Sequence, residues 1–272
     1  MKNIKCYLLD IDGTVSLGEN LIEGADKFIE HVRNEGNKII FMTNNSSKNG
    51  LAYKAKLGRM GIDASTEEIF TSGDATIYYL NDIKKGANVF LLGNEYLQED
   101  FIKAGFNLVT KRDETVDFVV LGFDTTLTYE KLWKACDYIR SGTSYVATHP
   151  DLNCPLPDGK WMPDTGAMIE MIYASTGVRP KIIGKPNKLL VDIIKKKFNF
   201  KASEMAMVGD RLYTDMMLGD NAGIKKVLVL SGETDLLTYE KQDKIKVDYV
   251  LNSIKDLLSH VIWALVKSFS IC

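Results

Sequence analysis

The stretch CYLLDIDGTV, residues 6–15, decides the fold of this chain. Its first part is short and apolar, which is typical of a buried strand, and the strand is expected to end at Asp10. A helical pattern of apolar residues follows over residues 25–32, and a second apolar run at residues 38–42 ends at Thr43. Strands that alternate with helical patterns predict an α/β fold with mainly parallel strands.

The same alternation continues through the rest of the chain. Apolar runs predict further strands, and helical patterns separate them, at residues 89–92, 118–121, 145–147, 205–208 and 226–230. The apolar runs at residues 89–92, 118–121 and 145–147 form a separate α/β set. The alternation that opens the chain resumes after residue 184. We therefore expect a Rossmann-like three-layer core with a parallel sheet, formed by residues 1–79 and 180–272. An inserted α/β cap domain is expected to occupy residues 80–179.

Composition indicates an ordinary folded protein and excludes several functional classes. The chain has 272 residues, 45% of them hydrophobic and 26% charged, with a formal net charge of −2. This balance gives no excess of positive charge that would favour binding to nucleic acid or to an anionic membrane surface. The most apolar tail segment, residues 261–266, is far shorter than the about 20 residues that span a bilayer. Four scattered cysteines without a C-x-x-C pair and the lack of a signal peptide predict free thiols and a cytoplasmic location.

Polar side chains follow three of the predicted strands. Asp10 and Asp12 follow the first strand, Thr43 ends the second, and Asp210 and Asp215 follow a later one. In open parallel sheets, ligands bind beyond the carboxyl ends of the strands, so these groups are expected to face one crevice. Carboxylates held close together are unfavourable unless they meet a cation, and Mg²⁺ prefers one or two carboxylates with water and phosphate oxygens.

These residue types indicate phosphoryl transfer, in which enzymes mainly position groups and neutralise charge. Asp10 is expected to attack phosphorus as a nucleophile and to form an aspartyl phosphate. Asp12 would protonate the leaving alkoxide and then take a proton from the water that hydrolyses the intermediate. Lys185 and the hydroxyl of Thr43 could hold the phosphoryl group.

Four motifs in this chain resemble those of the haloacid dehalogenase superfamily, most of whose members are phosphatases. They occur in the expected order: DIDGTV at residues 10–15, Thr43 at a strand end, Lys185 in GKP, and GDRLYTD at residues 209–215. The segment FMTNNSS at residues 41–47, the α/β insert and the GKP sequence are similar to the NagD-like, or p-nitrophenylphosphatase-like, branch.

The resemblance implies hydrolysis of a small phosphate ester such as a nucleotide, a sugar phosphate or phosphoglycolate. Caps of this branch often pair subunits into a homodimer, and the oligomeric state of this chain stays open here. The implied Mg²⁺ ligands are the Asp10 carboxylate, the Asp12 backbone carbonyl and Asp210, with Asp215 holding a metal-bound water. The implied phosphate contacts are Thr43, the backbone of Asn44, and Lys185.

The insert also contains a long segment, residues 148–163, which is expected to be a loop. Loops longer than about 12 residues in compact domains are usually functional or disordered. His149 and Asp151 offer polar contacts there, and Trp161 offers a stacking face. We expect these three residues to contact the part of the substrate that leaves.

Two other functions remain open at this point. A phosphotransferase or mutase would use the same aspartyl phosphate but pass it to another hydroxyl. A non-catalytic phosphometabolite-binding protein would keep the fold, although such a protein has little need for both Asp10 and Asp12. A dehalogenase is less compatible, because its chemistry requires neither the metal nor a proton donor at Asp12. An EF-hand calcium loop is excluded because Gly13 comes too early.

Overall fold

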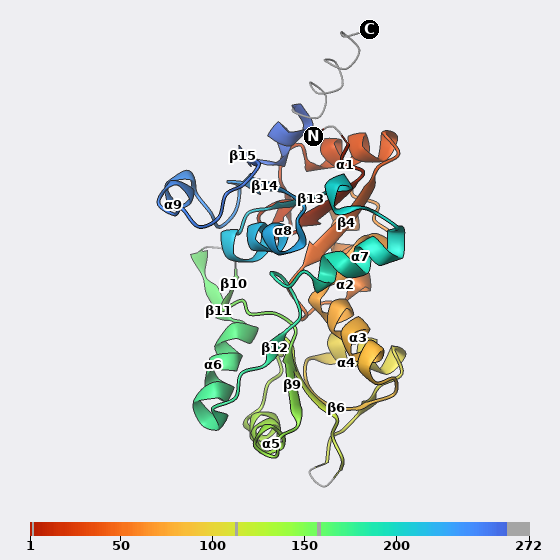
Figure 1. Ribbon diagram of the computed structural model, residues 1–272, viewed down its shortest axis with the longest axis vertical. Coiled ribbons are helices and arrows are strands. Elements are labelled where there is room, and N and C mark those ends of the chain that lie inside the picture. The colour runs from red at the N-terminus through yellow and green to blue at the C-terminus, as the bar shows by residue number, and fades with distance from the viewer. Residues whose placement is uncertain (2, 112–113, 157–158, 260–272) are drawn as a thin grey trace. The chain divides into compact units, whose positions relative to one another are not determined.

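The computed structural model describes residues 1, 3–111, 114–156 and 159–259 (Figure 1). The chain divides into two compact units. We call the first, Met1–Thr43, Lys54–Phe70 and Pro186–Cys272, the core unit, and the second, Asn44–Tyr53 and Thr71–Lys185, the insert unit.

The predicted domain boundaries differ from this division by several residues. The domain boundary expected after residue 79 falls inside helix α3 (Ser72–Ile83), which belongs to the insert unit. The boundary expected after residue 179 comes six residues before the observed one, which follows Lys185. Whether the two units behave as separate domains stays a prediction.

The core unit is built on a six-stranded sheet, and its observed strand pairs are parallel (Figure 1). Its middle strand β1 is buried along its whole length, as is its neighbour β13, which fits their nearly continuous apolar sequences. Leu9 of β1 lies opposite Val208 of β13 and Phe41 of β4. The order is β15-β14-β13-β1-β4-β5, with bounds β15 Tyr249–Leu251, β14 Lys225–Val229, β13 Met205–Gly209, β1 Cys6–Asp10, β4 Lys38–Thr43 and β5 Ile69–Thr71.

Helices and one short hairpin complete the core unit. Helix α1 presents Phe28, Ile29 and Val32 to the interior, which is the predicted apolar face. The hairpin pairs β2 (Ser16–Leu17) with β3 (Asn20–Leu21) directly after the DIDGTV stretch. The helices are α1 Ala25–Asn34, η1 Thr66–Glu68, α7 Leu189–Phe198, η3 Ala202–Glu204, the π-helical turn η4 Leu212–Met216, α8 Met217–Ala222 and α9 Leu236–Glu240.

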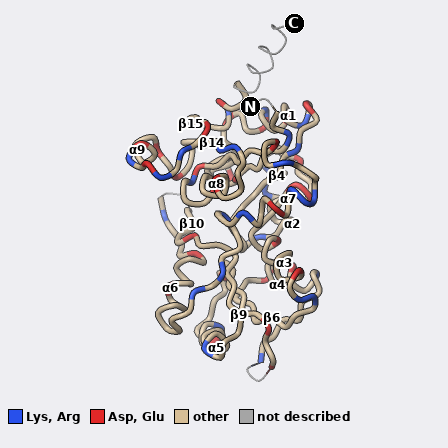
Figure 2. Tube along the Cα trace, in the orientation of Figure 1, with Lys and Arg blue, Asp and Glu red and all other residues tan. Residues whose placement is uncertain are grey.

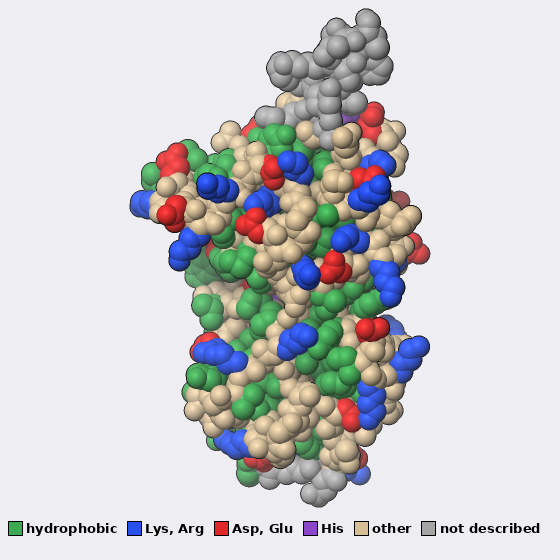
Figure 3. Space-filling model, in the orientation of Figure 1, with side chains coloured by type: hydrophobic (Ala, Val, Ile, Leu, Met, Phe, Trp, Pro, Cys, Tyr) green, Lys and Arg blue, Asp and Glu red, His purple; other side chains and the backbone are tan. Residues whose placement is uncertain are grey.

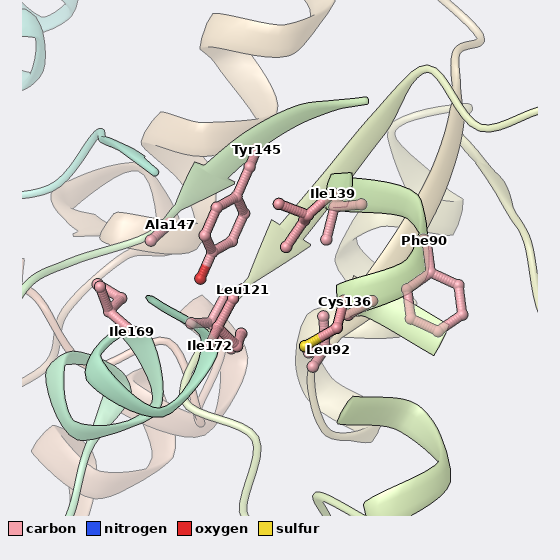
Figure 4. Packing of buried hydrophobic residues seen from close by; sticks show 11 residues of the cluster. Phe90, Leu92, Leu121, Cys136, Ile139, Tyr145, Ala147, Ile169 and Ile172 are labelled. Carbon is pink, nitrogen blue, oxygen red and sulfur yellow. The ribbon is translucent and has the colours of Figure 1, made fainter. Parts of the chain in front are cut away.

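The insert unit has a parallel five-stranded sheet of its own. Figure 4 shows its apolar core, in which Tyr145 and Ala147 of β9 and Leu121 of β8 pack with Ile169 and Ile172 of α6. The order is β12-β9-β8-β6-β7, with bounds β12 Lys181–Ile182, β9 Ser144–Ala147, β8 Phe118–Leu121, β6 Asn88–Leu92 and β7 Asn107–Leu108. Its helices are α3, α4 Glu95–Lys103, α5 Tyr129–Arg140 and α6 Thr165–Thr176.

The segment expected to be a loop, residues 148–163, contains a β-hairpin. Strand β10 (Asn153–Pro155) pairs with the antiparallel strand β11 (Trp161–Pro163). Each strand contains a proline, and a proline in a sequence normally argues against a strand because it is tolerated in sheets mainly at edge strands. The sequence therefore did not predict this hairpin. The expectation of a structureless loop was therefore wrong.

Helix α2 (Gly50–Arg59) buries a face that contains a lysine. Tyr53, Lys56 and Leu57 are buried, whereas Leu51 is 59% exposed. Periodicity of apolar residues could not identify this face, since a lysine occupies one of its positions.

Surface charge follows the balance that composition predicts. Basic and acidic residues are intermixed along the chain in Figure 2, and Figure 3 shows their side chains interspersed on the face drawn. Cys6, Cys136 and Cys154 are free thiols, and burial raises the pKa of the Cys6 thiol to about 12. Cys272 and the apolar tail segment lie outside the described residues. Within the described part of the chain, no helix has both the length and the hydropathy to cross a membrane.

Truncation of Ile172 to alanine should destabilise the insert unit. Ile172 is fully buried in the cluster of Figure 4, so its loss leaves a cavity that lowers the free energy of unfolding by about 2–5 kcal/mol. Met171→Ala is the matched control, because Met171 lies beside it on α6 and is 42% exposed. Urea denaturation followed by circular dichroism measures both variants, and equal shifts would contradict the observed packing.

Candidate active site

Three buried carboxylates come together at the carboxyl edge of the core-unit sheet. Asp10 ends β1, Asp210 directly follows β13, and Asp215 lies in the π-helical turn η4. One oxygen from each lies within 4.8 Å of the others, and the residues are only 8%, 2% and 0% exposed. They converge because β1 and β13 are parallel neighbours, so both strands end at the same edge.

This group fits a hard divalent cation. Three buried carboxylates repel one another in a medium of low dielectric, and a cation between them removes that repulsion. Oxygen donors, and carboxylates in particular, are the ligands that Mg²⁺ and Ca²⁺ prefer. The arrangement is therefore a candidate metal centre.

Glycines make room for these carboxylates. A β-carbon at Gly13, whose φ is +97°, or at Gly232 would overlap the Asp210 carboxylate. A β-carbon at Gly209 would overlap the side chain of Asp215 in the same way. Larger residues at these positions would displace the acidic groups.

The segment after β14 holds Asp210 in place. The backbone N–H of Glu233 donates to Oδ2 of Asp210 at 2.6 Å, and the Ser231 hydroxyl donates to the Gly13 carbonyl at 2.7 Å. The Glu233 carboxylate forms an ion pair with Arg211 at 2.9 Å. Sequence reasoning missed Ser231 and Glu233, although polar residues after a strand predicted to end at residue 230 were a usable signal.

Asp215 is held through the chain that follows β13. Its Oδ2 accepts from the backbone N–H of Arg211 at 3.1 Å. Asp215 lies within the π-helical turn η4, and such turns are frequent at functional sites.

Asp12 lies outside the three-carboxylate group, and its side chain has a different partner. Lys56 of α2 donates from Nζ to Oδ1 of Asp12 at 2.7 Å. The prediction that Asp12 binds metal concerned its backbone carbonyl and stays a prediction. Sequence reasoning missed Lys56, since a lone lysine in a helical pattern is normally a surface residue.

The predicted phosphate-binding residues belong to different units. Thr43 ends β4 of the core unit and is 4% exposed. Asn44 and Lys185 lie in the insert unit, where the Asn44 side chain accepts from the Lys185 backbone N–H at 2.8 Å and donates to the Lys185 carbonyl at 3.1 Å. A β-carbon at the adjacent Gly184 would overlap Oδ1 of Asn44. The Asn44 side chain therefore anchors the GKP segment.

His149 is buried and has partners at both ring nitrogens. It has no exposed surface, its Nε2 lies 2.9 Å from Oδ1 of Asp164, and its Nδ1 lies 2.9 Å from the Thr148 hydroxyl. A buried imidazole engaged in this way holds its segment together. The prediction that His149 contacts the substrate stays a prediction.

The other two residues of the segment differ in exposure. Asp151 is 5% exposed and accepts from the Asn44 side chain at 3.1 Å. Trp161 is 57% exposed on β11. The predictions that Asp151 and Trp161 contact the substrate remain predictions, and the exposed ring of Trp161 is the better placed of the two.

Comparison with known proteins gives the family. Residues 7–107 match the model of the haloacid dehalogenase-like hydrolases, and residues 182–257 match that of a HAD-hydrolase-like family. The chain is 40% identical over 257 residues to an acid sugar phosphatase of Staphylococcus haemolyticus, covering 94% of this chain and 95% of that protein.

Solved structures agree with that assignment. The 4-nitrophenylphosphatase of Thermotoga maritima superposes with a TM-score of 0.89 at 43% identity, over 94% of this chain and 97% of that one. A structure described as a putative nagD protein shares 43% identity with a TM-score of 0.85, over 92% and 95% of the two chains. A glycerol phosphate phosphatase of Mycobacterium tuberculosis in complex with magnesium is 29% identical with a TM-score of 0.85, over 92% of this chain and 74% of that one.

The α/β fold, the ordered motifs and relatives that are named phosphatases across nearly the whole chain lead to one conclusion. This chain belongs to the haloacid dehalogenase-like hydrolases, and within them to the NagD-like phosphatases.

Proposed function

We propose that this phosphatase is Mg²⁺-dependent and hydrolyses a small phosphorylated metabolite through an aspartyl phosphate at Asp10. The observation that carries the proposal is the group of three buried carboxylates, Asp10, Asp210 and Asp215, whose oxygens lie within 4.8 Å of one another. A cation shared by Asp10 and the other two would bring a substrate phosphate to the strand end that carries the nucleophile.

Mg²⁺ would be held by the Asp10 carboxylate, the Asp12 carbonyl and Asp210, with Asp215 binding through water. When bound, it would neutralise the charge of the phosphoryl oxygens and so lower the barrier to attack by an anion. The magnesium in the related glycerol phosphate phosphatase supports this choice of ion.

Each protein group has a defined part in the proposed reaction. One carboxylate oxygen of Asp10 attacks phosphorus, the bond from phosphorus to the ester oxygen breaks, and Asp12 gives that oxygen a proton. Asp12 then takes a proton from water, the water oxygen attacks phosphorus, and the bond from phosphorus to Asp10 breaks. Inorganic phosphate leaves, Asp10 is again a carboxylate, and Asp12 again carries the proton with which the cycle began.

Contacts to the phosphate are proposed for Thr43, the backbone of Asn44, and Lys185, as the family resemblance implies. For the rest of the substrate we propose a sugar phosphate or a similar small ester. The acid sugar phosphatase of Staphylococcus haemolyticus, 40% identical over almost the whole chain, supports that class.

Asp10→Asn should leave a folded protein without measurable turnover. The amide keeps the shape of the carboxylate but is a poor nucleophile, so kcat should fall by about 10³-fold or more, equal to about 4 kcal/mol of barrier. Asp26→Asn is the control, because Asp26 is exposed in the first turn of α1. Steady-state hydrolysis measures both, and a D10N variant with a tenth of wild-type activity would rule out the covalent mechanism.

Mg²⁺ should both activate and stabilise the protein. At 100 times its Kd, a ligand of the folded state adds about 2.7 kcal/mol of stability, so Tm should rise with Mg²⁺ and activity should vanish on chelation. Gly232→Ala should raise the Mg²⁺ concentration needed for either effect by about tenfold or more, since its methyl group displaces Asp210.

Gly58→Ala is the control for that substitution, because Gly58 of α2 has open space around it. Thermal melts and activity across a Mg²⁺ titration give the comparison. Full activity after exhaustive chelation would show that the metal is not required.

Asp12→Asn should slow phosphorylation most for substrates with poor leaving groups. A sugar alkoxide needs a proton on departure and nitrophenolate does not, and general acid catalysis typically contributes about 10²–10⁴-fold. Single-turnover phosphorylation by a hexose phosphate and by p-nitrophenyl phosphate measures the two losses. Equal losses would remove Asp12 from the role of proton donor.

A further inference from the structure

Lys56 is a buried lysine whose ammonium group meets the side chain of Asp12. Lys56 is 4% exposed on α2, and its Nζ donates to Oδ1 of Asp12 at 2.7 Å. Within the described part of the chain, this is the one hydrogen bond that either side chain makes. Lysine is almost never this buried unless it is paired, because its charge is costly to remove from water.

The two ends of the pair are unequally exposed. The side chain of Lys56 is 5% exposed and that of Asp12 is 36% exposed. An ion pair on the same helix, Arg59 with Glu19, shows the ordinary surface case, with exposures of 60% and 58%. The Lys56 side chain is therefore fixed by the packing around it, whereas the Asp12 carboxylate lies at the accessible end of the pair.

The backbone of Asp12 is fixed independently by a tight turn. The N–H of Gly13 donates to the Ser16 carbonyl at 2.8 Å, and the N–H groups of Val15 and Ser16 both donate to the Ile11 carbonyl at 2.9 Å. With its backbone held, Asp12 keeps only rotations about its side-chain bonds. The hydrogen bond from Lys56 restricts those rotations, and it occupies Oδ1 while leaving Oδ2 for a proton.

We propose that Lys56 is a positioning residue that orients the Asp12 carboxylate for proton transfer to the leaving oxygen and from the attacking water. This inference rests on the proposed role of Asp12 as proton donor and acceptor. A correctly oriented catalytic group accelerates a step by removing the entropy cost of alignment at the moment of reaction. Without Lys56 the Asp12 side chain samples several rotamers, and only some of them present Oδ2 to the ester oxygen.

A purely structural role is the alternative, in which the pair only joins α2 to the turn over residues 11–16. That role would lower stability and would slow the reaction equally for all substrates. A positioning role instead slows the reaction mainly where the leaving oxygen needs a proton.

The test compares Lys56→Met with Lys54→Met in single-turnover phosphorylation at saturating substrate and Mg²⁺. Lys54 is the matched control because it is an exposed lysine on the same helix. For a hexose phosphate, K56M should phosphorylate about 10- to 10²-fold more slowly, within the range of general acid effects. For p-nitrophenyl phosphate the loss should be below about threefold, and KM for both substrates and the Mg²⁺ midpoint should stay at wild-type values. Lys56→Arg, which keeps the charge, should recover most of the rate.

The double variant K56M/D12N separates this inference from the proposed function. If Lys56 acts through Asp12, adding K56M to D12N causes no further loss of phosphorylation by the hexose phosphate. A further loss of tenfold, or equal K56M losses on both substrates, would overturn the inference. If K56M does not fold, Lys56→Gln carries the same comparison. D12N by itself tests the role of Asp12: a leaving-group effect in D12N with wild-type rates in K56M would reject Lys56 and keep the proposed function.

Discussion

The mutual repulsion of three buried carboxylates is the constraint on which the rest of the site depends. Their oxygens lie within 4.8 Å of one another, where two unit charges repel by about 3 kcal/mol at an effective dielectric constant of about 20. The fold supports this arrangement with backbone hydrogen bonds to Asp210 and Asp215 and with glycines that leave space for both. A divalent cation among the three carboxylates would remove that repulsion, which is the physical basis of the proposed metal site.

Sheet topology explains how residues distant in sequence share one site. Asp10 and Asp210 meet because β1 and β13 are adjacent and parallel, although the insert unit separates them along the chain. The core unit carries the three acidic residues at one edge of its sheet. Asn44 and Lys185, for which phosphate contacts are proposed, belong to the insert unit. The proposed phosphate contacts therefore draw on residues of both units, whereas the candidate metal ligands belong to the core unit.

Much of this arrangement could be predicted from the sequence, because strand ends and short motifs are local signals. The strands before Asp10, Thr43 and Asp210 were visible as apolar runs, and parallel pairing then implied that their ends converge. Features that depend on tertiary packing have no comparable local signal in the sequence. Lys56 interrupts an apolar face, His149 looks like a polar loop residue but is fully buried, and the hairpin around Trp161 is masked by prolines. In each case tertiary packing determines the environment, and one-dimensional periodicity does not encode it.

In the proposed reaction the phosphoryl group passes through a covalent bond to Asp10. The direct measurement is rapid acid quenching of the enzyme during turnover of a ³²P-labelled sugar phosphate, followed by proteolysis and mass spectrometry. A covalent intermediate at Asp10 predicts an acid-stable, base-labile label on the peptide that contains Asp10, appearing no later than free phosphate. Release of phosphate with no labelled peptide at any quench time, or label on a different peptide, would contradict it.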